Sequence, residues 1–196
     1  KRQEGSTGIP EYSTTINRGE MPPSLSVGAI TFHETPPQKV VDKCKSLYAE
    51  SPYSTQIIGA TKALVGEVNR ECQKLINPDG ERLQFRLHGE EFFLDMRVGD
   101  PILFTRNNYN IGIQNGSLGV LSSTERDTQD GQETFGVVTL DTGEAISITD
   151  EVFDCMELGY GITLHKAQGS QFPRIIVAVQ KGRISDRAWL YTAITR

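Results

Sequence analysis

The chain has 196 residues, with 20 Lys and Arg against 25 Asp and Glu, a formal net charge of -5, and 37% hydrophobic residues. This composition is typical of a globular protein and excludes a disordered chain. No apolar run approaches the roughly 20 residues of a membrane helix, and none follows Lys1 as a secretory leader would, so we expect no membrane partner. Three widely spaced cysteines exclude a disulfide framework and a Cys-based zinc site, and they favour a reducing, cytoplasmic compartment.

The first 77 residues predict an α/β arrangement. Turn formers are frequent up to residue 53, and short helices are expected at 10–17 and 38–49. Residues 55–60 are typical of a buried strand, and Thr61 is placed to cap a helix over 62–76. The apolar positions of that helix are Leu64, Val65, Val68, Cys72, Leu75 and Ile76.

Residues 78–155 change to a pattern of strands and turns. A hairpin is expected around residues 88–90, and a tight loop at 141–143 joins the last two strands. Several short strands in so few residues predict a small barrel of SH3-like type. The expected strands span residues 84–87, 91–94, 100–106, 117–121, 134–140 and 144–148.

The α/β pattern returns in residues 156–196. We expect a short helix at 163–168, a buried strand at 174–179, and a helix at 186–195 capped by Ser185. The sequence therefore predicts three parts: an α/β segment over 1–77, a β-rich insertion over 78–155, and the resumed α/β domain over 156–196.

The charge is unevenly distributed between these parts. Residues 97–155 carry three Arg against ten acids, whereas residues 156–196 carry six Lys and Arg against two acids. A basic excess in the last segment suits a polyanionic partner, although a fluctuation in surface charge is an equally good explanation at this point.

One segment concentrates chemically versatile side chains. Thr163, His165, Lys166, Gln168, Gly169 and Ser170 fall within eight residues. Hydroxyl, imidazole, amine and free backbone N–H groups are donors that a phosphodiester backbone accepts. The alternative is an ordinary surface helix that ends at Gly169. No second His or carboxylate lies at metal-ligand spacing from His165, so no metal site is expected.

Arg196 follows an apolar helical stretch, Leu190 to Thr195. An arginine there can bind the last carbonyl groups of the helix. It can also act as an arginine finger, which stabilises negative charge on a transferring phosphoryl group.

These segments together resemble superfamily 1B DNA helicases of the RecD type. Residues 163–170 (TLHKAQGS) resemble their motif V, and residues 191–196 (YTAITR) resemble their motif VI. Residues 57–69 are similar to the strand and helix that open the second motor half of the family. Residues 99–109, followed by Asn115-Gly116, resemble the start of its SH3-like insertion, and Arg2-Gln3 with residues 16–20 resembles the end of motif IV.

The resemblance implies a RecA-like parallel sheet, interrupted by an SH3-like insertion, in a 5′-to-3′ helicase. It also implies that Thr163, His165 and Lys166 contact single-stranded DNA, and that Arg196 and Arg2 reach the γ-phosphate. Gln168 would lie between the DNA and ATP sites, with Gly169 and Gln171 close to the nucleotide. The family usually has an acid at the position of Gln171, which leaves the tuning of ATP contacts open. Tyr109 and Phe104 are candidates for base stacking, with barrel core favoured for Phe104.

No Gly-x-x-x-x-Gly-Lys-Ser/Thr loop is present, and no Asp-Glu pair on a buried strand suits magnesium. We therefore expect a fragment that needs the first motor half of the same polypeptide and, on its own, binds neither ATP nor Mg²⁺ tightly and does not hydrolyse ATP. The partner of the full-length protein would be single-stranded DNA. The full-length protein would be a subunit of a repair nuclease complex, with the other subunits as further partners, or a stand-alone helicase, or part of a conjugation protein. The rival interpretation is a non-catalytic α/β plus SH3-like module that binds a protein or nucleic acid.

Overall fold

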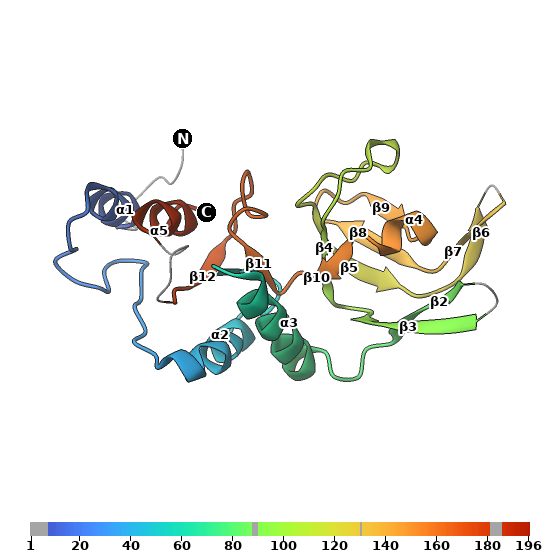
Figure 1. The fold of residues 1–196 in the computed structure, drawn as a ribbon, viewed down its shortest axis with the longest axis horizontal. Helices are drawn as coiled ribbons and strands as arrows, with labels where there is room; N and C mark the ends of the chain where they lie inside the picture. Colours follow the sequence, from blue (N-terminus) through green and yellow to red (C-terminus); the bar gives the residue numbers. More distant parts are fainter. Residues whose placement is uncertain (1–7, 88–89, 130, 181–185) are drawn as a thin grey trace. The chain divides into compact units, whose positions relative to one another are not determined.

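The computed structural model describes residues 8–87, 90–129, 131–180 and 186–196 (Figure 1). The chain forms two compact units. Unit 1 comprises Lys1–Glu67 and Ile162–Arg196, and unit 2 comprises Val68–Gly161. Among the described residues, none of the helices is both long enough and apolar enough to cross a membrane.

A three-stranded sheet forms the centre of unit 1, in the order β11-β1-β12. Strand β1 (Thr55–Gly59) is buried along its whole length, as predicted. It pairs in parallel with β12 (Arg174–Ala178), so that Thr55 lies opposite Arg174 and Gly59 opposite Ala178. Strand β11 spans Gly161–Thr163. The predicted α/β fold with a parallel sheet is therefore confirmed.

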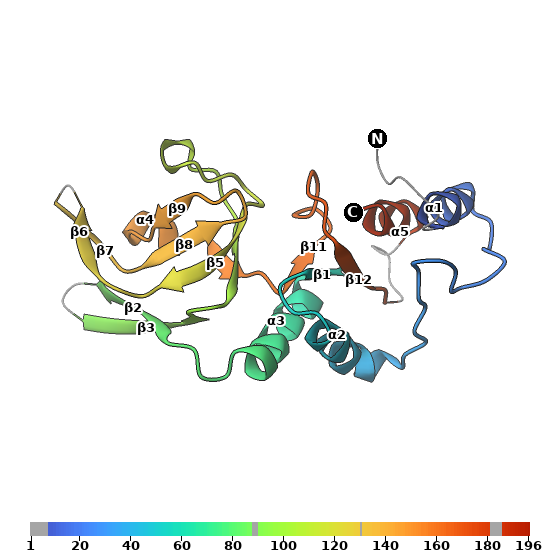
Figure 2. The same ribbon diagram turned by 180° about the vertical axis from the view of Figure 1, so that it is seen from behind.

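Helices pack around this sheet (Figures 1 and 2). Helix α2 (Val40–Ala49) follows a 3-10 turn, η1 (Pro37–Lys39), and contacts β1 and β12. Helix α1 (Ile9–Arg18) lies beside α5 (Arg187–Ile194). Helix α3 (Lys62–Ile76) begins where expected, because the hydroxyl of Thr61 accepts a hydrogen bond from the Leu64 amide at 3.2 Å.

Unit 2 is built around an antiparallel five-stranded sheet in the order β10-β4-β5-β8-β9. Two hairpins, β2–β3 and β6–β7, complete its strands. The strands and short helices of unit 2 are β2 Arg82–Leu87, β3 Glu90–Arg97, β4 Pro101–Phe104, η2 Tyr109–Ile111, β5 Leu118–Ser123, β6 Asp127–Gln129, β7 Gln132–Thr134, β8 Val137–Leu140, β9 Ala145–Ser147, α4 Asp150–Phe153 and β10 Met156–Leu158.

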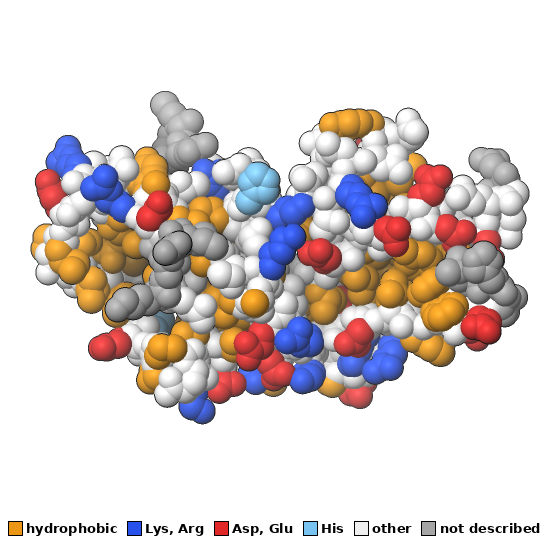
Figure 3. All heavy atoms as spheres, viewed as in Figure 1, with side chains coloured by type: hydrophobic (Ala, Val, Ile, Leu, Met, Phe, Trp, Pro, Cys, Tyr) orange, Lys and Arg blue, Asp and Glu red, His pale blue; other side chains and the backbone are white. Residues whose placement is uncertain are grey.

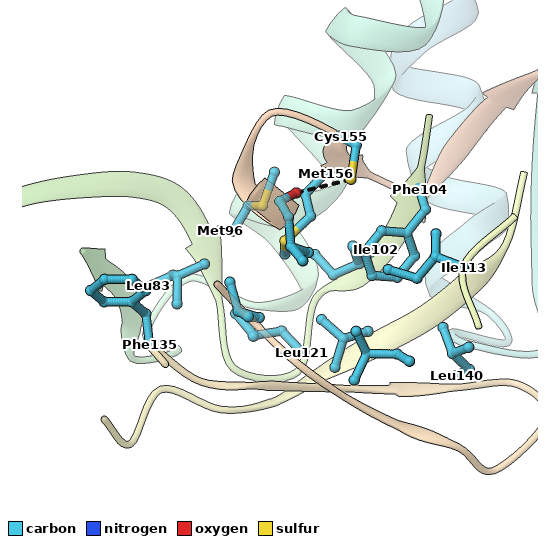
Figure 4. Packing of buried hydrophobic residues seen from close by; sticks show 14 residues of the cluster. Leu83, Met96, Ile102, Phe104, Ile113, Leu121, Phe135, Leu140, Cys155 and Met156 are labelled. Atoms are coloured by element: carbon cyan, nitrogen blue, oxygen red, sulfur yellow. Dashed lines mark hydrogen bonds between the residues drawn. The ribbon is translucent and has the colours of Figure 1, made fainter. Parts of the chain in front are cut away.

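The core of unit 2 is a cluster of buried aliphatic, aromatic and sulfur side chains (Figure 4). Phe104 is fully buried in it, which confirms its assignment to the core. The short helix α4 adds Val152, whose carbonyl accepts a hydrogen bond from the Cys155 thiol at 3.0 Å. Apolar side chains also reach the surface of this unit (Figure 3); among them are Phe92 and Phe93 on β3, with Phe93 57% exposed.

A closed SH3-like barrel is not seen in the described part of the chain. Strands β9 and β10 are the edges of the sheet and do not pair with each other there. Each has only three residues, and α4 lies between them in the sequence. The sheet is therefore open, and the core is covered by α4 and the β2–β3 hairpin instead of by closure.

Three local predictions were wrong. Residues 163–168 do not form a helix: β11 ends at Thr163 and a turn follows. The N-cap of α5 is Asp186, whose carboxylate accepts a hydrogen bond from the Trp189 amide at 2.8 Å, while Ser185 lies outside the described residues. Leu75 is 50% exposed, because α3 buries a different set of positions from those that apolarity alone predicts.

Candidate nucleic-acid and phosphate interface

The segment that resembles motif V forms a compact turn after β11. The carbonyl of Thr163 accepts hydrogen bonds from the amides of Lys166 (2.9 Å) and Ala167 (3.2 Å). Leu164 and Ala167 are buried beneath the turn, whereas His165 and Gln168 are exposed. Two apolar anchors thus hold the turn while its polar side chains face outward.

Three polar side chains at this turn are available to a ligand. Within the described residues, the side chains of Thr163, His165 and Gln168 form no hydrogen bond with the rest of the chain. A phosphate oxygen could therefore accept from the hydroxyl or the imidazole without displacing a protein partner. This geometry agrees with phosphate contact.

Gly169 ends the turn in a left-handed conformation, with φ of 90°. A side chain would be strained at this φ, although an added Cβ would meet no atom within 4 Å. The glycine is therefore required by the backbone conformation, and the space beside it is open to an approaching group.

The turn and the end of α5 are joined through one backbone contact. The amide of Phe172 donates a hydrogen bond to the carbonyl of Arg196 at 3.2 Å. Gln171, which is exposed, immediately precedes Phe172. Within unit 1 this contact places the end of α5 beside the residue that follows Gln171.

Arg196 has a structural contact of its own. Its Nε donates to the carbonyl of Thr192 at 3.2 Å, and its backbone amide donates to Ala193 at 3.3 Å. These contacts satisfy carbonyl groups at the end of α5, as the helix-capping alternative requires. Within the described residues Arg196 makes no ion pair, so its two terminal nitrogens retain donors for an oxyanion.

A pocket of about 790 Å³ lies next to Arg196 in unit 1. Residues of β12, α2 and the preceding loop line it, including Arg174 and Cys44. Burial raises the pKa of the Cys44 thiol to about 11, because a thiolate is poorly solvated there. Cys44 is buried, and burial favours its neutral thiol form. All three cysteines are buried, and none of them forms a disulfide.

The remaining predicted site residues are Arg2 and Tyr109. Arg2 lies outside the described residues. Tyr109 is in unit 2, at the start of η2, and its side chain is 75% exposed. An aromatic ring this exposed can stack on a base, so Tyr109 remains a candidate contact. Among the described residues no group of three or more His, Cys, Asp or Glu side chains could hold a metal ion.

Sequence reasoning missed a buried polar network in unit 2. Asp100 is fully buried and accepts four hydrogen bonds. The donors are Gln73 Nε2 (2.6 Å), Asn77 Nδ2 (2.7 Å), the Tyr160 hydroxyl (2.8 Å) and the Arg97 amide (2.8 Å). Gln73 lies in the last turn of α3 and Asn77 directly follows the helix, so their spacing of four residues was a signal available in the sequence.

Comparison with known proteins now connects this geometry to a family. Residues 158–196 match the UvrD-like helicase C-terminal domain. The ATP-dependent RecD2 DNA helicase of Deinococcus radiodurans is 31% identical over 132 residues, which cover 66% of this chain and 16% of the relative. The RecBCD enzyme subunit RecD of Buchnera aphidicola is 30% identical over 122 residues, covering 59% of this chain and 19% of the relative.

Solved structures share the fold. A Bacteroides Pif1 helicase in complex with ADP-AlF3 and single-stranded DNA matches with a TM-score of 0.60 and 19% identity, over 98% of this chain and 47% of that chain. The Candida albicans Pif1 helicase matches with a TM-score of 0.56 and 14% identity, over 100% of this chain and 52% of that chain. The chain thus spans less than a fifth of these two curated relatives and about half of the structures, and its resemblance to RecD-type helicases is confirmed.

Proposed function

We propose that this chain is the second motor half of an ATP-dependent 5′-to-3′ DNA helicase, with residues 1–77 and 156–196 forming a RecA-like domain and residues 78–155 an SH3-like insertion. The observation that carries the proposal is the contact between Phe172 and Arg196. It joins a turn with exposed phosphate donors to an arginine at the end of α5. The helicase-domain match covers this same region, residues 158–196.

The turn supplies contacts for single-stranded DNA in this proposal. Thr163, His165 and Lys166 would bind phosphates, and Tyr109 would stack on a base. Phosphate contacts fix the strand without reading its sequence, so we propose a slight sequence preference at most. RecD of Buchnera is a subunit of the RecBCD enzyme, which supports repair and recombination as the setting of this chain, alone or with further subunits.

The residues present could contact the phosphate groups of a nucleotide, but they do not form a complete nucleotide site. The guanidinium of Arg196 and the exposed amides of Gln168 and Gln171 can donate to phosphate oxygens, and the open side of Gly169 admits one. ATP bound in the longer protein supplies the phosphoryl group and, with Mg²⁺, the driving force for stepping. Arg196, with Arg2, would neutralise charge there, and Gln168 would connect the nucleotide to the DNA contacts.

Replacing Lys166 tests the DNA contact. We expect Lys166→Ala to weaken binding of a single-stranded oligonucleotide equally for all sequences, because one phosphate contact is lost. The slope of log K against log salt should become shallower by about 0.7. Fluorescence anisotropy across a salt series measures both quantities.

Lys39→Ala is the matched control, since Lys39 is an exposed lysine of unit 1 that pairs with Asp42 at 3.6 Å. It should leave the slope unchanged. An unchanged slope for Lys166→Ala, or a sequence-selective loss, would contradict the assignment and favour the non-catalytic binding module.

The chain by itself should show no DNA-stimulated ATP hydrolysis and only weak nucleotide affinity. The physical reason is that its sequence contains no phosphate-binding loop that could hold the β- and γ-phosphates. A coupled phosphate-release assay with and without single-stranded DNA measures this. Robust turnover by the purified chain would refute the proposed division of labour between two motor halves.

A further inference from the structure

Three amide side chains form a stripe towards the end of helix α3: Asn69 and Gln73 lie in the helix, and Asn77 directly follows its last residue, Ile76. Their spacing of four residues places them on one side of the helix. Asn69 is only 7% exposed and Gln73 only 1%. Buried amides are costly without partners, so each must have a specific role in the fold.

Asn69 holds the backbone at the start of β11. Its Oδ1 accepts a hydrogen bond from the Gly161 amide at 2.6 Å, and its Nδ2 donates to the Gly161 carbonyl at 3.2 Å. Nδ2 also donates to the Leu158 carbonyl at 2.9 Å. One side chain therefore satisfies both polar backbone groups of Gly161, which is the first residue of the strand that ends at Thr163.

The same segment is fixed by a second contact. The hydroxyl of Tyr160 donates to Asp100 at 2.8 Å, and Asp100 also accepts from Gln73 and Asn77 of the stripe. Close packing adds a steric limit, because a Cβ at Gly161 would lie 3.1 Å from Val68 Cγ1. Residues 158–161 thus have little freedom to shift along α3.

We propose that Asn69 is a positioning residue for DNA binding. By fixing Gly161, it sets the position of β11 and of the turn over residues 163–170, which directly continues the strand. This inference rests on the proposed function, because it assumes that the turn contacts single-stranded DNA. Asn69 itself touches the backbone of this chain and not the ligand.

The test compares two variants of the same stripe. Asn69→Leu keeps the approximate size of the side chain and removes all three hydrogen bonds to Leu158 and Gly161. Gln73→Leu removes the bonds to the Asp95 carbonyl and Asp100 and leaves Gly161 held. Both variants lose buried hydrogen bonds, so Gln73→Leu controls for general destabilisation. Binding of a 16-nucleotide oligo-dT is measured below the melting transition of each variant.

We expect Asn69→Leu to raise the dissociation constant for DNA by about tenfold. This is the lower end of the effect seen when a hydrogen bond that orients a metal-binding side chain is removed, which is a comparable supporting role. Its salt slope should fall towards that of Lys166→Ala, while Gln73→Leu keeps the wild-type slope. Wild-type affinity in folded Asn69→Leu would overturn the inference, as would an equal loss in both variants.

Asn69→Asp provides a second variant if Asn69→Leu does not fold. It retains an acceptor for the Gly161 amide but places oxygens against the carbonyls of Leu158 and Gly161, so binding should again weaken. Wild-type binding by this variant also counts against the inference. Lys166→Ala distinguishes the positioning role of Asn69 from the proposed function. If Lys166→Ala loses affinity and neither Asn69 variant does, only the positioning role is wrong. If Lys166→Ala loses no affinity, the proposed function is wrong.

Discussion

Arg196→Ala in the longer protein that contains both motor halves is expected to reduce ATP turnover by about 10³- to 10⁵-fold, the range for an arginine finger. Single-stranded DNA binding should stay nearly unchanged. Negative charge grows on the γ-phosphoryl oxygens in the transition state, and a guanidinium stabilises it there more than in the ground state. Arg196→Lys should restore little, because an ammonium lacks the planar fork that spans two oxygens.

The structure makes the alternative concrete. Nε of Arg196 already donates to the Thr192 carbonyl, so a purely structural role predicts a loss of about 1 kcal/mol or less in stability and normal turnover per folded molecule. Arg187→Ala, an exposed arginine on the same helix, is the control and should leave turnover intact. Turnover and thermal stability measured on one preparation of Arg196→Ala decide between the roles. Wild-type turnover with a lowered Tm would exclude the finger.

Asp100→Ala is expected to lower the free energy of unfolding of unit 2 by about 3 kcal/mol or more, since hydrogen bonds to charged groups contribute about 1.5–3 kcal/mol each and do not simply add. Four donors lose their common acceptor in this variant. Asp100→Asn should also destabilise the unit, because an amide offers one acceptor oxygen and turns its NH₂ group towards donors.

Two spectroscopic signals can locate this loss. Trp189 is the only tryptophan and belongs to unit 1, so its fluorescence follows that unit, whereas circular dichroism follows both. We expect urea to shift the circular dichroism transition of Asp100→Ala more than the fluorescence transition. Asp95→Asn is the control, because the Asp95 side chain is 66% exposed and its ion pair with Arg97 is long, at 3.7 Å. A transition at the wild-type urea concentration in Asp100→Ala would contradict the role of the network.

The sequence predicted best where one physical factor dominates. Helix α3 begins and ends at the expected residues, because Thr61 caps it and Asn77-Pro78 stops it. Strand β1 is a short segment with Ile57 and Ile58 at its centre and is buried on both faces. These features depend on local chemistry, which is visible in a single sequence.

Prediction failed where distant partners decide. The apolar residues of the segment 163–170 have helical spacing, but the segment forms a tight turn after β11. The Thr163 carbonyl accepts the hydrogen bonds of this turn, and Leu164 and Ala167 are buried beneath it. Asn69 and Gln73 occupy buried positions of α3 because their partners lie in residues 95–161, whereas Leu75 is half exposed. The roles of Thr163, His165, Lys166 and Arg196 came from family resemblance, and they remain predictions.

The parallel pairing of β1 with β12 also has a consequence for folding kinetics. Thr55 pairs with Arg174, so the ribosome must add more than a hundred residues after β1 before its partner exists. Every pair within Val68–Gly161, by contrast, can form as soon as that stretch has emerged. Loop closure over such a separation is slow, because its entropy is lost before the contact is gained. We therefore expect the β-rich unit to fold first during synthesis, while β1 stays unpaired with β12 until residues 174–178 have been made, which exposes Ile57 and Ile58 to aggregation in that interval.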